Sequence, residues 1–247
     1  MGSTGDSFSF KSLLAVLPRG EPLDVAFLKE KGLGTAHASH LAKAGWLTHL
    51  GRGVYMLPGD TLTRDGCLAY LMRRQASVHV GGKTALAWRG VKHDISFRET
   101  ISLWGEQSLR LPEWLVSRYA CTYQTTRLFD PKLPPDFGIR PLPVGHRGVL
   151  VSVPERALLE VLSDVGKTES LQDARLLVEC ARTLRSSVLE TLLTHTTRIK
   201  VVRLARALAQ ELDLPWAGLA KKCSEAKGGG SRWIAVSKDG ERLDLAP

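Results

Sequence analysis

Residues 22–58 read PLDVAFLKEKGLGTAHASHLAKAGWLTHLGRGVYMLP, and this stretch decides the fold of the N-terminal third of the chain. Its pattern predicts a short helix, a glycine-containing turn, a second helix and a tight two-stranded ribbon. Asp24 is suited to cap the first helix and Gly32 to end it, while Thr35 and Gly45 are placed to begin and end the second. This succession is that of a winged helix-turn-helix, which lays its second helix in the major groove of DNA.

The second helix, expected over residues 35–44, has an outer face of small and polar side chains. Its core side is expected to consist of Ala38, Leu41 and Ala44, at helical spacing. Base edges can come close to the opposite face, which is predicted to contact DNA through Thr35, Ser39, His40 and Lys43. His37 falls nearer the core side, so it is either a partly buried histidine or a further DNA contact.

A basic hairpin follows that helix directly. Residues 46–50 and 54–57 are typical of strands, and Gly51-Arg52-Gly53 joins them. Glycines allow close approach to a groove edge, and a cation at the tip suits a phosphate. We therefore predict that Arg52 meets phosphate or the minor groove. The alternative is a plain surface hairpin with an exposed arginine. A hairpin directly after a helix-turn-helix favours the wing.

The chain is basic, with a formal net charge of +9, and the excess is unevenly distributed. Residues 1–91 carry 11 Lys and Arg against 6 Asp and Glu, whereas residues 92–247 carry 23 against 19. A denser basic excess is expected on a surface that meets phosphates. A mildly basic, well-solvated protein would have the same total charge, so charge alone does not decide between them.

No membrane segment, secretory signal or metal site is expected from the sequence. Apolar runs fall short of the roughly 18–20 residues that a membrane helix needs, and the N-terminus lacks a basic region followed by an apolar one. The four cysteines form no CxxC pair and are expected to be reduced thiols in or near the core, without a disulfide. They are Cys67, Cys121, Cys180 and Cys223. These features favour a cytoplasmic protein with no cofactor.

The remaining pattern predicts an α+β protein, in which the winged helix-turn-helix is followed by a larger mixed α/β domain. We expect one domain over residues 1–91 and a second over residues 92–247, with a helical C-terminal half and a closing hairpin. Helices are predicted over residues 8–17, 61–74, 83–89, 154–165, 169–184, 187–195 and 198–212. Strands are predicted over residues 78–80, 99–105, 148–153, 233–236 and 242–245.

The chain lacks the usual short signatures of catalysis. GxSxG, HExxH and a GxGxxG after a strand are all missing. Gly82-Lys83-Thr84 resembles the end of a phosphate-binding loop, but the full motif needs a glycine where Ser77 stands. Glu155-Arg156 could form an acid–base pair, although a structural arginine bonded to a neighbouring loop is the preferred interpretation. No catalytic residue is assigned.

A second candidate surface lies on the helix over residues 198–212. Lys200 and Arg203 are three residues apart and would lie on one side of it. They would bind phosphate or an acidic partner, or else form a solvated basic stripe.

Several stretches resemble the AbiEi-type antitoxins, the regulator half of bacterial type IV toxin–antitoxin pairs. The resemblance rests on HLAKAGWLTHLGRGVYMLPGD, VHVGGKTALAWRG, VSVPERALLEVLSDV, KVVRL, LPW and GGSRWIAV, which follow in the family's order along nearly the whole chain. His37 departs from the family, which tends to be aliphatic there, and the segment AKKCSEAK has no counterpart that we identify.

This resemblance implies a winged helix-turn-helix joined to a C-terminal α/β antitoxin domain. It implies repression of the protein's own operon through repeated promoter sites in double-stranded DNA. It also implies neutralisation of a nucleotidyltransferase-like toxin, without a stable complex, and makes the GGKT stretch a signature of the fold. The alternatives are a stand-alone DNA-binding regulator, a protein-interaction module without a toxin partner, and, less favoured, a nucleotide-binding enzyme.

Overall fold

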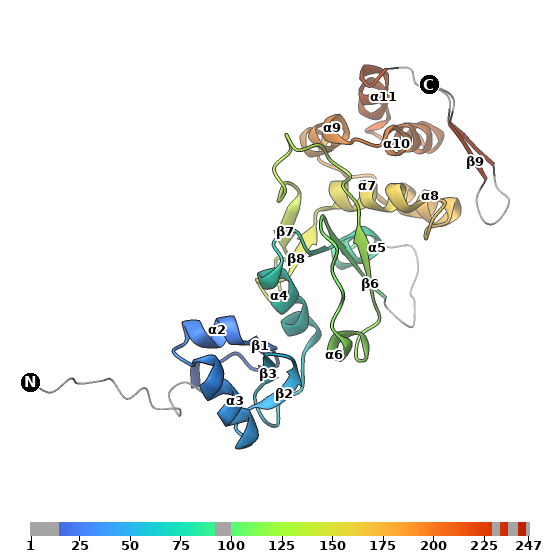
Figure 1. Ribbon diagram of the computed structural model, residues 1–247. Helices are drawn as coiled ribbons and strands as arrows, with labels where there is room; N and C mark the ends of the chain where they lie inside the picture. The colour runs from blue at the N-terminus through green and yellow to red at the C-terminus, as the bar shows by residue number, and fades with distance from the viewer. Residues whose placement is uncertain (1–14, 92–99, 229–232, 237–241, 246–247) are drawn as a thin grey trace, which may run out of the picture.

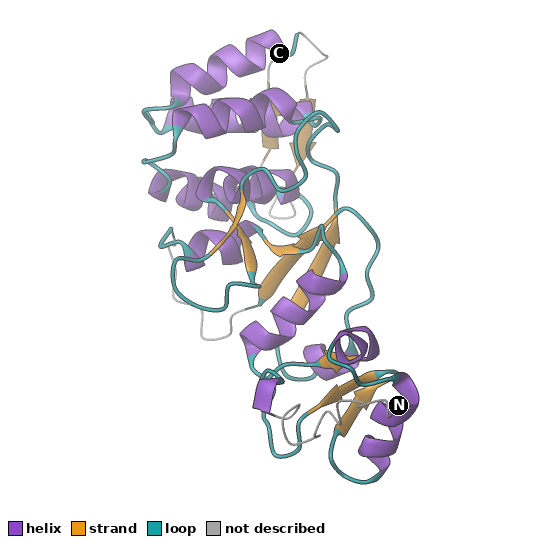
Figure 2. Cartoon of the chain, turned by 90° about the vertical axis from the view of Figure 1, so that its left-hand side faces the viewer, coloured by secondary structure: helices purple, strands orange, loops and turns teal. Residues whose placement is uncertain are grey.

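The chain folds into two lobes at opposite ends of an elongated molecule. The computed structural model describes residues 15–91, 100–228, 233–236 and 242–245, the last two segments by their backbone alone. Figure 1 shows a small lobe of α2, α3 and β1–β3 at one end and the helices α7–α11 at the other, with a sheet between them. The same order is visible after a quarter turn (Figure 2).

The helices and strands have the following bounds. The helices are α2 (Val25–Glu30), α3 (Thr35–Lys43), α4 (Arg64–Arg74), α5 (Gly82–Trp88), α6 (Glu113–Val116), α7 (Pro154–Asp164), α8 (Leu171–Cys180), α9 (Ser186–His195), α10 (Ile199–Glu211) and α11 (Ala217–Ala226). The strands are β1 (Leu23–Asp24), β2 (Thr48–Gly51), β3 (Val54–Met56), β4 (His79–Val80), β5 (Ile101–Gly105), β6 (Cys121–Thr125), β7 (Ile139–Pro141), β8 (Leu150–Ser152), β9 (Trp233–Val236) and β10 (Arg242–Leu245).

The small lobe is a winged helix-turn-helix, as predicted. Its antiparallel sheet has the order β1-β3-β2, and the Asp24 carboxylate caps α2 by accepting a hydrogen bond from the Phe27 amide at 2.8 Å. Gly32 and Gly45 have φ angles of +85° and +80°, which favour glycine after a helix. The predicted cap at Thr35 is wrong, because extended Gly34 takes the N-cap position and Thr35 is the first helical residue.

The larger lobe is built on a mixed sheet with the order β6-β5-β4-β8-β7. Strand β4 pairs antiparallel with β5 and parallel with β8, so it lies at the centre. Helices α7–α11 are stacked beyond the sheet, on the side away from the winged helix (Figure 2). The α+β fold class, the helical C-terminal half and the closing β9–β10 hairpin are thereby confirmed.

Hydrophobic side chains form two separate cores, one in each lobe. The smaller core runs from Leu17 to Leu57, and the larger from Met56 to Cys223. Helices α4 and α5 bury their apolar faces in the larger core, although they precede residue 92. The domain boundary between residues 91 and 92 stays a prediction.

Four predictions along the chain need comment. The helix over residues 8–17 lies mostly outside the described residues. The helix predicted over 169–184 is shorter, since α8 ends at Cys180, and α11 was not predicted at all. All four cysteines are free, but Cys180 is exposed and not in the core. Within the described part of the chain, no helix is long and apolar enough to cross a membrane.

The buried Glu160 carboxylate ties the larger lobe together. Its Oε1 lies 3.0 Å from His79 Nε2 of β4 and 3.1 Å from Arg156 Nε, and its Oε2 accepts a hydrogen bond from the Gly82 amide at 2.9 Å. The Ser152 hydroxyl on β8 lies 3.0 Å from both oxygens. Burial acts to raise the pKa of Glu160, but the charges of His79 and Arg156 and the hydrogen bonds hold it below its usual value.

A second buried carboxyl, Asp164 at the end of α7, is poorly compensated. Its Oδ2 accepts a hydrogen bond from Gln124 Nε2, but within the described residues its Oδ1 has no partner. Burial raises the pKa of Asp164 to about 7; Lys167 opposes the shift and Glu169 adds to it. The ionised form is therefore disfavoured in the folded state.

We expect Gly81→Ala to lower the free energy of unfolding by roughly 1–3 kcal/mol, the usual cost of overpacking a filled site. A Cβ at Gly81 would lie 2.5 Å from Glu160 Oε2 and 2.5 Å from Trp104 Cδ1. Gly218→Ala in α11 is the matched control, because nothing lies within 4 Å of its Cβ position. Urea unfolding followed by circular dichroism measures both, and equal stability of the two variants would contradict the proposed close contact.

We expect Asp164→Asn to stabilise the protein by roughly 2–4 kcal/mol at pH 8, since one pKa unit corresponds to ~1.4 kcal/mol. The folded-state pKa lies above the ordinary value of 3.8, so the wild type loses stability as the pH rises from about 4 through 7. The advantage of the variant should therefore shrink as the pH falls from 7 toward 4. Urea unfolding at several pH values tests this, and a gain independent of pH would argue against it.

Candidate nucleic-acid interface

Helix α3 presents the predicted contact residues on its open side. Ala38 and Leu41 are its only fully buried residues and pack into the small core together with Leu28 of α2. The four predicted residues of α3 are all exposed, namely Thr35, Ser39, His40 and Lys43. The structure thus brings them together on one outward face. Their contact with DNA stays a prediction.

His37 is exposed, and the alternative of a partly buried histidine is wrong. The physical reason is that α3 has nine residues and buries a stripe only one turn wide, which Ala38 and Leu41 fill. Ala44, expected on the core side, is also exposed and forms the C-cap. His37 is therefore exposed at the side of the helix next to Leu41. Across the described residues, no group of three or more His, Cys, Asp or Glu side chains could hold a metal ion.

The β2–β3 hairpin forms the wing, and both of its flanking glycines are held in place. The Val25 amide at the start of α2 donates a hydrogen bond to the Gly53 carbonyl at 3.1 Å. A Cβ at Gly51 would lie 3.8 Å from Trp114 Cδ1. The indole ring of Trp114, on α6, therefore packs against the end of β2. Between them Arg52 is exposed at the tip. The wing is therefore supported by both lobes.

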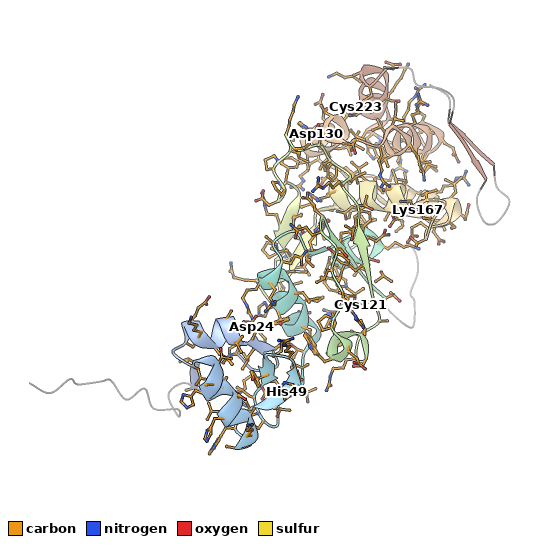
Figure 3. All side chains as sticks on the ribbon, viewed as in Figure 1. Asp24, His49, Cys121, Asp130, Lys167 and Cys223 are labelled. Carbon is orange, nitrogen blue, oxygen red and sulfur yellow. The ribbon has the colours of Figure 1, made fainter. Side chains whose placement is uncertain are left out.

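Sequence reasoning missed further exposed side chains along the wing. Thr48 and His49 are exposed on β2, and the His49 ring meets the Tyr55 ring edge-on, with 5.6 Å between the ring centroids. Figure 3 labels His49 in the small lobe. Trp46, just after α3, is 53% exposed. Side chains of a strand alternate between its two faces, so the apolar Leu47 could have indicated that Trp46 and Thr48 are exposed. His49 breaks that alternation because the register shifts between His49 and Gly51.

The surface made by α3 and the wing has a one-sided charge. Residues 31–59 contain no Asp or Glu, but they contain three lysines or arginines and three histidines. The first turn of α3 carries no acid either, so no carboxylate there offsets the positive N-terminal end of the helix dipole. Such a surface attracts the phosphates of nucleic acid and meets no internal carboxylate that would compete.

Polar contacts between side chains fasten the small lobe to α4 and to the loop before β8. Asp24 Oδ2 lies 3.2 Å from Arg74 Nη1, and Glu21 Oε1 lies 2.6 Å from His146 Nε2. The Arg73 guanidinium stacks over the Phe27 ring with 4.8 Å to its centroid. Figure 3 shows Asp24 where the small lobe faces α4. These contacts hold α3 and the wing in a fixed direction relative to the larger lobe.

The Gly82-Lys83-Thr84 stretch has structural partners for each of its members. The Gly82 amide donates to Glu160, and the Thr84 hydroxyl donates to the Thr100 carbonyl at 3.1 Å. Lys83 Nζ pairs with Glu169 and lies 3.3 Å from Asp173 Oδ2. The lysine that would meet a phosphate is thus occupied by two carboxylates. The Gly82-Lys83-Thr84 stretch therefore has a structural role in this fold.

The prediction that Lys200 and Arg203 form an open basic surface on α10 is wrong. Arg203 is 3% exposed, because α10 packs against α7 on one side and α11 on the other. Lys200 is half-buried, and its Nζ donates a hydrogen bond to the Val165 carbonyl. Burial lowers the pKa of Lys200, and the nearby cations Lys167 and Arg198 lower it further. Neither side chain offers an open cation to a partner.

The preferred structural interpretation of Glu155-Arg156 is confirmed. Arg156 Nη1 donates hydrogen bonds to the carbonyls of Pro135 at 3.3 Å and Phe137 at 2.7 Å, in the loop before β7. Glu155 instead pairs with Arg185, with 2.8 Å between Oε2 and Nη2. The two neighbouring side chains therefore serve separate contacts and do not act as an acid–base pair.

Comparison with known proteins agrees with this arrangement. A family model described as a transcriptional regulator, AbiEi antitoxin, type IV TA system matches residues 98–244, and that of the AbiEi antitoxin N-terminal domain matches residues 7–97. No curated protein matches the chain. The crystal structure of the RV2827C protein from Mycobacterium tuberculosis is similar in fold, with a TM-score of 0.57 and 16% identity over 92% of this chain and 82% of that chain.

The two family models together span both lobes, including the winged helix-turn-helix and the sheet with its stacked helices. They describe a family of regulators and not a family of enzymes. The chain belongs to the AbiEi family of antitoxins and transcriptional regulators of type IV toxin–antitoxin systems.

Proposed function

We propose that this protein represses its own operon by binding repeated sites in its promoter. Helix α3 enters the major groove with Thr35, Ser39, His40 and Lys43, and the wing brings Arg52 to phosphate or the minor groove. The observation that carries the proposal is the exposed surface of α3 and the wing, which combines small polar side chains with cations and has no carboxylate.

We further propose that the protein acts as an antitoxin against a nucleotidyltransferase-like toxin, without forming a stable complex and without catalysis of its own. Family membership supports this part. It would act in the cytoplasm, where bacterial DNA lies. With Arg203 buried and Lys200 half-buried, a change at either would act through the packing around α10, and exposed side chains of the larger lobe are better candidates for contact with a toxin.

We expect the double substitution Lys43→Ala and Arg52→Ala to weaken binding to the protein's own promoter DNA at moderate salt. If each cation neutralises one phosphate, the slope of log affinity against log salt concentration should fall by about 2, since each contact contributes ~0.9. Fluorescence anisotropy with labelled promoter DNA at several salt concentrations measures both quantities.

The matched control is Lys167→Ala with Arg182→Ala, which removes two exposed cations from the larger lobe. This pair should leave affinity and salt slope nearly unchanged, because the substitutions lie far from the winged helix. Unaltered binding and salt dependence in the Lys43 and Arg52 variant would refute the assigned interface.

We expect repression and antitoxin activity to separate in the same variant. When expressed from a foreign promoter beside the toxin, the Lys43→Ala and Arg52→Ala protein should still restore growth, because its larger lobe is unchanged. A reporter fused to its own promoter should be derepressed. Growth of cells that carry the nucleotidyltransferase reading frame nearest to this gene, together with the reporter signal, gives both readouts.

Loss of both activities together would contradict the division of labour between the lobes. Promoter binding without any toxin that the protein neutralises would favour the stand-alone regulator. Capture of a partner protein without promoter binding would favour an interaction module.

A further inference from the structure

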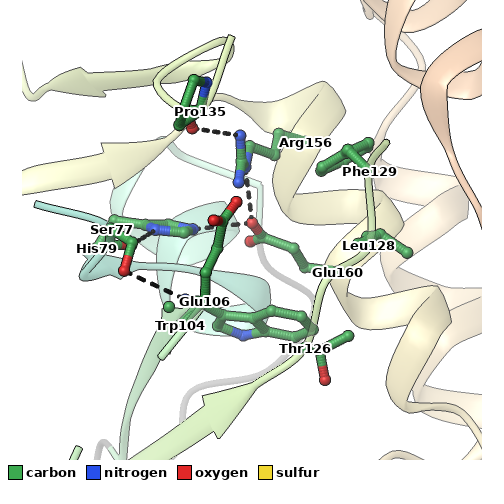
Figure 4. A pocket seen from close by; sticks show the side chains of 11 residues that line it. Ser77, His79, Trp104, Glu106, Thr126, Leu128, Phe129, Pro135, Arg156 and Glu160 are labelled. Carbon is green, nitrogen blue, oxygen red and sulfur yellow. Dashed lines mark hydrogen bonds and ion pairs between the residues drawn. The ribbon is translucent and has the colours of Figure 1, made fainter. Parts of the chain in front are cut away.

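A cleft opens beside the Glu160 cluster in the larger lobe (Figure 4). It consists of an outer cavity of about 250 Å³ and a narrow inner one of about 20 Å³. Both are lined by Glu106, Phe129, Pro135 and Arg156. The inner cavity has room for one water-sized group, and the outer one for a small organic molecule.

Apart from the Glu106 carboxylate, the side chains at the floor of the cleft carry one net positive charge. His79 Nδ1 lies 2.9 Å from the Ser77 carbonyl, which can only accept, so Nδ1 is protonated. A second proton lies between Nε2 and Glu160 Oε1, because these two atoms are 3.0 Å apart. Because Glu160 is ionised, this proton lies on Nε2, the histidine–glutamate pair is neutral as a whole, and the charge of Arg156 remains. The excess positive charge beside the Arg156–Glu160 pair favours an anion in the cleft, a position that the Glu106 carboxylate approaches from the side.

Arg156 directs part of its guanidinium into this space. It is 8% exposed, with Nε held by Glu160 and Nη1 held by the loop carbonyls. Its Nη2 has no hydrogen-bond partner within the ranges that the structure describes, and the residue lines both cavities. The guanidinium stacks on the Phe129 ring, with 4.9 Å to the centroid, which fixes its plane.

The outer cavity combines an apolar wall with a second cation. Leu133 and the neighbouring prolines provide the wall, and Arg127 is exposed at the rim without an ion pair in the described part of the chain. Asp130 at the same rim is already paired with His195, with 3.0 Å between Oδ1 and Nδ1. Figure 4 shows the Glu106 carboxylate turned toward the floor, where it would compete with an anionic ligand.

We propose that this cleft binds a small organic acid, in which a phosphate or carboxylate group is attached to a compact apolar or aromatic body. The acid group meets Arg156 Nη2 and Arg127, and the apolar body lies against Phe129 and the prolines. The ligand displaces the Glu106 carboxylate. This site is separate from the DNA-binding surface, and its occupancy does not depend on the proposed function.

Phenyl phosphate and benzoate are suitable probes for the full-length protein, with inorganic phosphate and neutral benzyl alcohol as comparisons. Titrations followed by ¹H–¹⁵N correlation spectra should show saturable binding of at least one aromatic acid, with shifts at the cleft. Tighter binding of phenyl phosphate would indicate phosphate esters as the natural class, and tighter binding of benzoate would indicate carboxylic acids.

Arg127→Gln should weaken binding of the better probe about 3- to 10-fold, the range expected for loss of one partly exposed charge contact. Glu106→Gln should strengthen it a few-fold, because it removes the competing carboxylate. Arg182→Gln, on an exposed side chain elsewhere, should leave it unchanged. Arg156→Lys should abolish binding, and a thermal melt checks that this variant still folds.

Because Arg127 and Glu106 are both exposed, their variants test the site even if Arg156→Lys fails to fold. The proposal is overturned if no probe binds saturably below about 10 mM, a ΔG weaker than roughly −3 kcal/mol. It is also overturned if benzyl alcohol binds as well as the acids, or if neither the Arg127 nor the Glu106 substitution changes the affinity.

Discussion

One buried carboxylate sets the geometry of the larger lobe. Glu160 accepts hydrogen bonds from a strand histidine, a helix N-terminal amide, a strand hydroxyl and an arginine of its own helix. A carboxylate has room for about four donors, so this one is saturated and ionised without exposure to water. Since the donors come from β4, α5, β8 and α7, no one of these elements can shift without leaving a buried charge uncompensated.

Helix α4 connects the larger lobe to the winged helix. That helix is buried in the larger core along most of its length, while its last turn carries Arg73 and Arg74, which hold Phe27 and Asp24 of the small lobe. Trp114 completes the connection, since it packs between Tyr70 of α4, at 5.5 Å between ring centroids, and Gly51 of the wing. The surface of α3 and the wing, proposed above to bind DNA, is thus oriented by the body of the protein.

The parts that could be predicted from sequence are those fixed by local rules. The Asp24 cap, the glycines after α2 and α3, and the wing hairpin depend on neighbouring residues, and the structure confirms them. The parts that could not be predicted depend on packing between distant segments. Arg203 looks solvated along α10 until α7 and α11 enclose that helix, and His37 looks half-buried until the core stripe of α3 proves to be one turn wide.

Charge shows how the two lobes differ in chemistry more clearly than any motif does. In the larger lobe many basic side chains are neutralised within the protein, as Lys83 is by Glu169, Arg175 by Glu211 and Lys222 by Glu190. Residues 31–59 of the small lobe contain no carboxylate that could do the same. This division suits the proposed repressor, since open cations over the whole surface would add non-specific affinity for DNA without specificity. Residues 31–59 carry three lysines or arginines and no acid, so the basic excess per residue along α3 and the wing exceeds the average of the chain, whose net charge is +9 over 247 residues.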